Sequence, residues 1–156
     1  MTVTVQIQID KPREIVWKAI TDIENAENMI SGISAIHVLH KPEHGLAGLK
    51  WEETRKMFGK SATETMWVTD AIENEYYDTR AESHGSAYLT RLSLTDRGSG
   101  TILSMSFTGI PQTTGAKILS FLLAPLITKS IKKALLQDLH DIKAFTEKQP
   151  DVTKHS

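Results

Sequence analysis

The chain has 156 residues, and its 18 Lys and Arg side chains nearly balance its 19 Asp and Glu side chains. A chain of this length fits one domain that buries about 70% of the surface exposed by the unfolded chain, which is enough for one sizeable core or cavity. The near-zero net charge offers no field for a phosphate backbone, so no nucleic acid partner is expected, and the absence of cysteine excludes disulfides, thiolate metal sites and cysteine nucleophiles.

The N-terminal segment predicts a strand followed by two short helices. Residues 2–9 alternate Thr or Gln with Val or Ile, which is the period of a half-buried strand. Asp10 and Pro12 supply start signals for a helix, and a second short helix follows Asp22 and ends at Gly32. The first residues contain neither the basic stretch nor the apolar stretch of a secretory signal, so a cytoplasmic location is expected.

The middle of the chain predicts an antiparallel sheet. From residue 33 to residue 110, strand-like runs alternate with short turns, which favour hairpins over parallel crossovers. A two-residue turn at His84-Gly85 would pair Tyr77 with Leu92 on the inner face. The same register sets Asp78 opposite Arg91 on the outer face, where the two charges attract each other.

A second hairpin places charged residues on the inner face of the sheet. A two-residue turn at Gly59-Lys60 sets Arg55 directly opposite Glu64, with Glu53 two residues away on the same face. Burying these ions costs several kcal/mol each unless they pair, so their presence indicates a hydrated or ligand-filled cavity. The Arg55–Glu64 pair, with Glu53, would then be a polar anchor that fixes a ligand carboxylate, carbonyl or phenol. The alternative is an ordinary ion pair, partly exposed at the edge of the sheet.

The segment from about residue 114 to residue 148 predicts one long helix. Apolar residues recur at helical spacing along it, and Asp138 is assigned to the opposite, polar face. Pro125 predicts a kink or break near Leu123. The apolar block at residues 118–127 is about half the length that spans a membrane, so stable membrane insertion is not expected. We expect this block to be buried; the alternative is a gate that flexes at Pro125 to admit a ligand or dock on a membrane.

Residues on the inner faces of the predicted elements form the candidate binding site. The residues expected to contact a ligand are Trp51, Glu53, Arg55, Glu64, Met66, Tyr77, Tyr88, Leu92, Met105, Phe107, Leu123 and Ile127. The candidates for an acid or base, if a reaction occurs, are Glu64, Glu53 and Tyr88. No cofactor is expected. No metal is expected either, because His40 and His44 lie in a predicted turn, where their spacing is not that of a helical metal-binding pair.

Three stretches resemble a known superfamily: "IDKPREIVWKAITDIENAENMI" at residues 9–30, "GLKWEETRKMFGKSATETMWVTD" at residues 48–70 and "LLAPLITKSIKKALLQDLHDIK" at residues 122–143. They are similar to the START-like SRPBCC superfamily, and most to its polyketide cyclase/dehydrase and lipid-transport branch. The resemblance implies an α+β helix-grip fold, in which a seven-stranded antiparallel sheet curls around the long C-terminal helix over a deep apolar cavity. We expect a single domain at residues 1–148 and a flexible tail at residues 149–156.

The resulting hypothesis is a protein that binds or transports a hydrophobic small molecule, such as a lipid, a polyketide-like compound or an aromatic metabolite. One alternative is a cyclase or dehydratase that uses cavity carboxylates without a metal. Another is a protein-interaction module that uses the outer sheet face around Trp67. A monomer and a homodimer both remain open.

Overall fold

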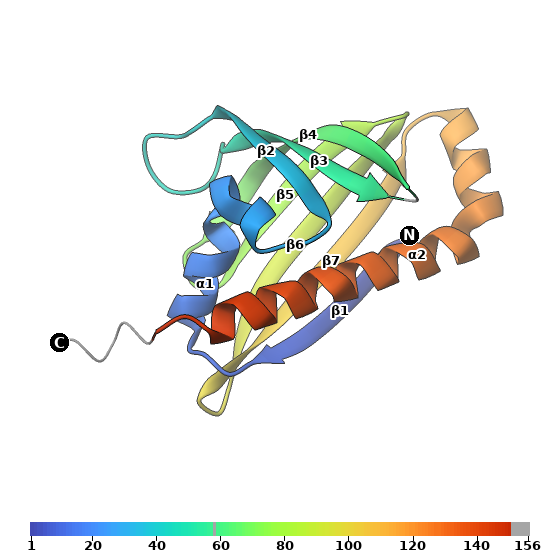
Figure 1. Cartoon of the computed structure of the whole chain (residues 1–156). Helices are drawn as coiled ribbons and strands as arrows, with labels where there is room; N and C mark the ends of the chain where they lie inside the picture. The colour runs from blue at the N-terminus through green and yellow to red at the C-terminus, as the bar shows by residue number, and fades with distance from the viewer. Residues whose placement is uncertain (58, 151–156) are drawn as a thin grey trace.

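Seven antiparallel strands form one sheet that curls around a long C-terminal helix (Figure 1). This computed structural model describes residues 1–57 and 59–150, so most of the predicted tail lies outside the described residues. The elements are β1 (Thr2–Ile9), α1 (Arg13–Thr21), the 3-10 helix η1 (Ile23–Asn28), β2 (Ile33–His40), β3 (Lys50–Met57), β4 (Lys60–Ile72), β5 (Tyr76–Ser83), β6 (Ser86–Arg97), β7 (Gly100–Pro111) and α2 (Thr114–Glu147). The α+β helix-grip prediction is confirmed.

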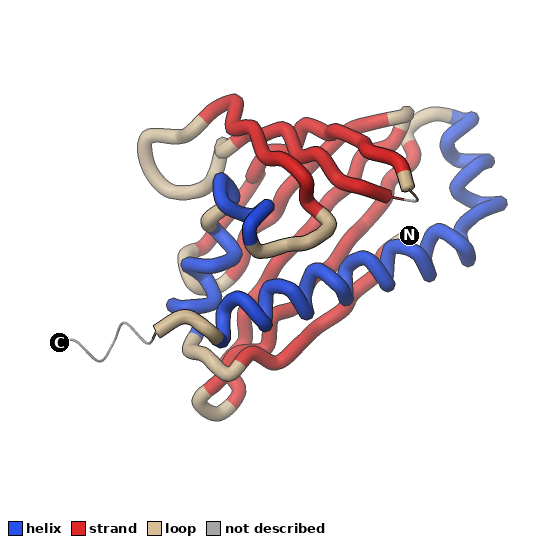
Figure 2. The backbone as a smooth tube through the Cα atoms, viewed as in Figure 1, coloured by secondary structure: helices blue, strands red, loops and turns tan. Residues whose placement is uncertain are grey.

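The sheet order β1-β7-β6-β5-β4-β3-β2 follows from the short connections between successive strands. Five hairpin connections link β2 through β7. The first strand, β1, pairs with the last strand, β7, so β1 and β2 form the two edges of the sheet. The alternation in β1 buries Val3, Val5 and Ile9 while Thr2 and Thr4 stay exposed. Sequential strands therefore lie side by side, and their inner faces form one concave surface (Figure 2).

The C-terminal half of α2 holds the sheet closed at one end. Leu139 and Ile142 on this helix are almost completely buried, together with Ile9 of β1, Val16 of α1 and Leu103 of β7. At roughly 2 kcal/mol for each large apolar side chain removed from water, this cluster is the main attachment of the helix to the sheet.

Two carboxylates of α2 fasten the loops that flank α1 and η1. Asp141 Oδ2 accepts hydrogen bonds from the backbone N–H of Ser31 at 2.9 Å and from its hydroxyl at 2.7 Å. Glu147 Oε2 accepts from the backbone N–H of Asp10 at 2.8 Å and from Lys143 Nζ at 2.7 Å. These bonds tie the chain at both ends of the short-helix segment to the same long helix.

The predicted register of the β5–β6 hairpin is confirmed. Tyr77 lies opposite Leu92, and Asp78 lies opposite Arg91 with a two-point ion pair of 2.6 and 2.8 Å. The turn requires positive φ at both central residues, and His84 has φ 51° while Gly85 has φ 75°.

The predicted register of the β3–β4 hairpin is wrong by two residues. Met57 pairs with Lys60, whereas the predicted turn was flanked by Phe58 and Ser61, and Phe58 is outside the described residues. Arg55 is therefore opposite Ala62, and Glu64 is opposite Glu53. Because side chains alternate with a period of two, this shift keeps every residue on its predicted face and changes only its neighbours.

The prediction that the apolar block of α2 is buried is also wrong. The helix is continuous from Thr114 to Glu147, it contains Pro125, and its first turns bend away from the sheet (Figure 1). The first buried residue of α2 is Leu135, so the block at residues 118–127 lies beyond the part of the helix that the sheet covers. No helix among the described residues is both long and apolar enough to cross a membrane.

Replacing Asp141 with alanine is expected to lower the free energy of unfolding at pH 7 by about 1 kcal/mol, because the three hydrogen bonds that Ser31 and Gln137 donate to its carboxylate are lost. Burial alone would raise the pKa of Asp141, but hydrogen bonds from Ser31 and Gln137 outweigh it and hold this pKa below its usual value. A lowered pKa stabilises the folded state above the unfolded pKa, and the benefit disappears as the pH falls below about 4. Urea unfolding of wild type and D141A at pH 7 and pH 3 measures both effects.

Replacing exposed Glu43 in the β2–β3 loop with alanine provides the control. This variant should have nearly the wild-type free energy of unfolding at either pH. An equal loss for D141A at both pH values would contradict a contribution from the ionised carboxylate.

Candidate functional site: a cavity between the sheet and the long helix

A cavity of about 660 Å³ lies between the concave face of the sheet and α2. Apolar side chains of α1 and η1, among them Ile20, Ile23 and Ala26, close one end of it. The lining residues that are themselves exposed are Ser31, Lys56, Ala62 and Gln137, so the mouth opens between the β3–β4 hairpin, the η1–β2 loop and α2. The volume is within the usual range for a site that takes a small organic ligand.

The alternation of the strands explains why these side chains meet. Ten of the twelve residues predicted to contact a ligand line the cavity: Trp51, Glu53 and Arg55 on β3, Glu64 and Met66 on β4, Tyr77 on β5, Tyr88 and Leu92 on β6, and Met105 and Phe107 on β7. Leu123 and Ile127 do not line it, because they lie in the part of α2 that has left the sheet. Contact of the ten residues with a ligand stays a prediction.

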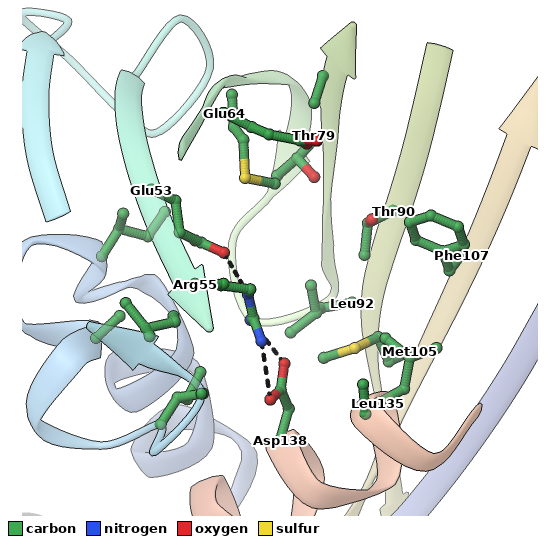
Figure 3. Close-up of a pocket in the computed structure, with 18 of the residues that line it drawn as sticks. Glu53, Arg55, Glu64, Thr79, Thr90, Leu92, Met105, Phe107, Leu135 and Asp138 are labelled. Carbon is green, nitrogen blue, oxygen red and sulfur yellow. Dashed lines mark hydrogen bonds and ion pairs between the residues drawn. The ribbon is translucent and has the colours of Figure 1, made fainter. Parts of the chain in front are cut away.

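Arg55 is held between two carboxylates, one from the sheet and one from the helix (Figure 3). Its Nε donates to Glu53 Oε2 at 2.7 Å, and its Nη1 and Nη2 donate to the two oxygens of Asp138 at 3.2 and 2.7 Å. Trp51 Nε1 donates to the other oxygen of Glu53 at 3.3 Å. A Cβ at Gly32 would lie only 3.1 Å from Arg55 Nη1, so the backbone there approaches the guanidinium closely.

Two negative groups share one positive group in this cluster, which therefore carries a net charge of about −1 when all three are ionised. Burial disfavours the charged form of Arg55, but the hydrogen bonds and charges of Asp138 and Glu53 outweigh it and raise the pKa of Arg55. Burial also raises the pKa of Asp138, and the hydrogen bonds from Arg55 only partly offset this effect. Arg55 therefore stays positively charged. Burial opposes the ionisation of Asp138, the carboxylate that α2 contributes to the cluster.

Sequence reasoning assigned Asp138 to the polar face of the long helix, and this assignment is wrong. Asp138 follows Leu135 by three residues and precedes Ile142 by four, so it lies on the buried face. Its helical spacing was the signal that could have identified it. An acidic residue within an otherwise apolar stripe points to a buried partner, and that partner is Arg55.

Glu64 does not pair with Arg55. Its Oε1 accepts a hydrogen bond of 3.1 Å from the hydroxyl of Ser83, and no bond to Oε2 is formed by the described residues. The hydroxyls of Thr79, Thr90 and Tyr88 also line the cavity without a hydrogen-bonding partner among the described residues. These groups are available to a ligand, and Figure 3 shows Glu64, Thr79 and Thr90 on neighbouring strands.

Two aromatic pairs stiffen the wall. Tyr77 is buried, its hydroxyl donates to the carbonyl of Ile20 at 2.9 Å, and its ring meets the edge of Trp17 at 6.0 Å between centroids. Burial, with a smaller contribution from the nearby charge of Glu53, raises the pKa of Tyr77, which excludes an ionised phenol near neutral pH. Tyr88 stacks on Phe107 with centroids 5.7 Å apart. Tyr77 is therefore a wall residue with a satisfied hydroxyl.

His40, His44 and Trp67 do not line the cavity. No group of three His, Asp or Glu residues in the described part of the chain has an arrangement that could hold a metal ion. His40 and His44 are exposed at the end of β2 and in the following loop. Trp67 is half-buried on β4 and is covered by Lys50, whose Nζ lies 5.9 Å from the ring centroid.

A family model described as polyketide cyclase/dehydrase and lipid transport matches residues 1–145. No curated protein shows a significant sequence match. The structure of TTHA0849 from Thermus thermophilus is similar, with a TM-score of 0.78, 16% identity and coverage of 100% of both chains. A START superfamily protein from Mycobacterium smegmatis has a TM-score of 0.76 and 16% identity, with 94% of this chain and 97% of that one covered.

The Zhui aromatase/cyclase from Streptomyces sp. R1128 has a TM-score of 0.75 and 10% identity, with 98% of this chain and 97% of that one covered. At these identities the structural likeness establishes a shared fold alone. The match to the family model covers far more than half of the chain.

Replacing Arg55 with methionine is expected to lower the free energy of unfolding at pH 7 by about 3 kcal/mol, because Glu53 and Asp138 lose their common counter-ion inside the cavity. The matched variant Asp138→Asn leaves the guanidinium balanced by Glu53 and should lose less. Because burial raises the pKa of Asp138, the stabilising contribution of this residue is complete below the unfolded pKa and declines as the pH rises above about 4. The deficit of D138N should therefore be smaller at pH 7 than at pH 4.

Urea denaturation of the three proteins at pH 4 and pH 7 checks these expectations. Equal losses for R55M and D138N at pH 7, or a D138N deficit that grows with pH, would refute the charge balance described for the cluster.

Proposed function

Because this chain belongs to the polyketide cyclase/dehydrase and lipid transport family, we propose that it binds a hydrophobic small molecule between its sheet and α2. The observation that carries the proposal is a cavity of about 660 Å³ whose wall is mostly apolar and contains a few converging polar groups. Binding would be driven by removal of apolar ligand surface from water, at roughly 25 cal/mol per Å². Met66 and Met105 offer flexible walls that adapt to irregular ligands.

Polar groups of the cavity would set the orientation of the ligand. The hydroxyls of Thr79 and Thr90, which no described residue bonds, lie opposite each other on β5 and β6, and Glu64 lies on the neighbouring strand β4. A ligand with a hydroxyl or carbonyl group can bond to the threonines, and one with an O–H or N–H can donate to Glu64. These contacts favour an apolar body with one or two neutral polar substituents.

The charge of the cavity favours a neutral ligand over an anionic one. The sequence suggested that Arg55, paired with Glu64, fixes a ligand carboxylate, carbonyl or phenol, but three of the Arg55 N–H groups already bond to Glu53 and Asp138. With Glu64 also facing the cavity, three carboxylates line it against two cationic side chains, Arg55 and Lys56. A ligand carboxylate would meet net negative charge in a region of low dielectric constant, which is unfavourable.

A second candidate is an enzyme that uses Glu64 as an acid or base. The specific observation is that no described residue bonds to Oε2 of this carboxylate, which faces the cavity, together with the similarity of the fold to an aromatase/cyclase. Glu53 suits this role less, because both of its oxygens already accept hydrogen bonds from Arg55 and Trp51. Glu64→Gln separates the two functions, since a carrier keeps binding with altered affinity, whereas an enzyme that needs the carboxylate loses turnover and still binds.

Thr90→Val should weaken binding of ligands that carry a hydroxyl or carbonyl by about tenfold and leave purely apolar ligands unaffected, because the two side chains have similar volume and only the hydroxyl is lost. The control is Thr95→Val on the same strand, where the side chain is exposed on the other face. Displacement of the neutral dye Nile red by 1-dodecanol and by dodecane measures both affinities. Failure of Nile red and both competitors to bind wild type at all would count against the proposed function.

A fatty alcohol should bind more tightly than the fatty acid of the same chain length, because the acid brings a second negative charge to the cluster around Arg55. Competition of 1-dodecanol and dodecanoate against Nile red at pH 7 tests this order. Asp138→Asn removes one negative charge and should narrow the difference. A preference for dodecanoate that D138N leaves unchanged would show that Arg55 attracts anions despite its two partners.

A further inference from the structure

The N-terminal half of α2 exposes a continuous apolar surface. The exposed fractions are 59% for Ile118, 57% for Leu119, 83% for Phe121, 68% for Leu122 and 67% for Leu126. These residues are on turns of the helix that project beyond the sheet (Figure 2). Single exposed apolar residues are ordinary, but a contiguous group of this kind on one helix marks an interaction surface.

The charge around this surface has one sign. Between Arg97 and Gln137 the sequence contains no Asp or Glu, whereas α2 carries Lys117, Lys129, Lys132 and Lys133 in this interval. All four lysines are exposed. The balanced charge of the whole chain therefore conceals a helix segment that is purely basic.

Two of the lysines, Lys129 and Lys133, share one face of the helix with Ile118 and Leu122. Leu122 follows Ile118 by four residues, Lys129 follows Leu122 by seven, and Lys133 follows Lys129 by four, and these spacings keep side chains on the same side of an α-helix. Along this face an apolar segment comes first and a basic segment follows within about two turns. An apolar surface bordered by lysines is typical of helices that lie at the surface of an anionic membrane.

We propose that the segment from Thr114 to Lys133 docks on an anionic lipid surface, with Ile118, Phe121 and Leu122 inserted between headgroups and the lysines facing lipid phosphates. At 1.5 Å per residue, this segment is about 30 Å long, but its basic half and Pro125 make it suited to lie on the surface instead of crossing it. The proposal goes beyond ligand binding, because it concerns the outer face of α2 and does not depend on what the cavity holds.

A second copy of the chain fits this surface less well. A symmetric pair brings the same face of both copies together, and the lysines from Lys117 to Lys133 would then face a segment that contains no carboxylate to balance them. Phospholipid headgroups supply the missing negative charge. An anionic lipid surface is therefore the occupant that satisfies both the apolar and the basic part of the face.

Flotation with vesicles of phosphatidylcholine, alone or with about one third phosphatidylglycerol, tests the proposal on the full chain. Wild type should float with the anionic vesicles and much less with the neutral ones, and roughly 1 M salt should reduce binding. Phe121→Ser with Leu122→Ser should lower the partition coefficient at least about tenfold, because two inserted side chains are lost. Lys129→Glu with Lys132→Glu should lower it by about fivefold or more for each lysine and abolish the preference for anionic vesicles.

The matched control is Leu39→Ser with Ile72→Ser, which removes two exposed apolar residues on β2 and β4 and should leave flotation unchanged. Circular dichroism and thermal unfolding establish that each variant is folded. Absence of wild-type flotation with the anionic vesicles would overturn the proposal, as would equal loss in the control. A dimer seen by light scattering that F121S/L122S dissociates, without vesicle binding, would assign the surface to a second copy and would also overturn it.

Discussion

Arg55 joins the two layers of the fold inside the cavity, and the arrangement of the site depends on this contact. The sheet contributes Glu53 and the helix contributes Asp138, so the guanidinium fixes the distance between β3 and α2 as well as its own orientation. A buried ion cluster gives less stability than a well-packed apolar core of the same size. The presence of this ion cluster is understandable if the cavity around Arg55 must stay open to a polar group of a ligand.

The molecule separates its charges between the inside and the outside. Carboxylates predominate in the cavity, while the exposed face of α2 is basic. Net charge alone conceals this division, because charges elsewhere in the chain bring the total to −1. A neutral ligand that leaves an anionic lipid surface would therefore pass from a region that attracts phosphates to one that disfavours them, and headgroups would not follow it into the cavity.

The sequence predicted the fold well because the fold depends on alternation and turn chemistry. The strands between residue 33 and residue 110 and the faces of their side chains could be read from the period of two, and even the two-residue error at the β3–β4 turn left Arg55 on the correct face. Partners could not be read in the same way. Arg55 bonds to Asp138, 83 residues away, and that contact depends on how the helix crosses the sheet.

Exposure was the other quantity that the sequence misjudged. An apolar block on a helix usually predicts burial. Where a helix extends past the end of the sheet, however, the same residues face solvent, as Phe121 does. The length of the sheet relative to the helix decides this, and that length depends on strand registers that local patterns do not fix. For the same reason, Leu123 and Ile127 were expected in the cavity and lie beyond it.

Pro125 separates two halves of α2 that differ in local stability. Proline has no N–H, so the carbonyl of Phe121 lacks the intrahelical bond that would continue the ladder across this point. The C-terminal half is anchored by buried Leu139 and Ile142, whereas the N-terminal half has no comparable anchor among the described residues. Backbone amides before Pro125 should therefore exchange rapidly with solvent, and those from Leu135 onward should be strongly protected, so that one continuous helix behaves as two separate units of local unfolding.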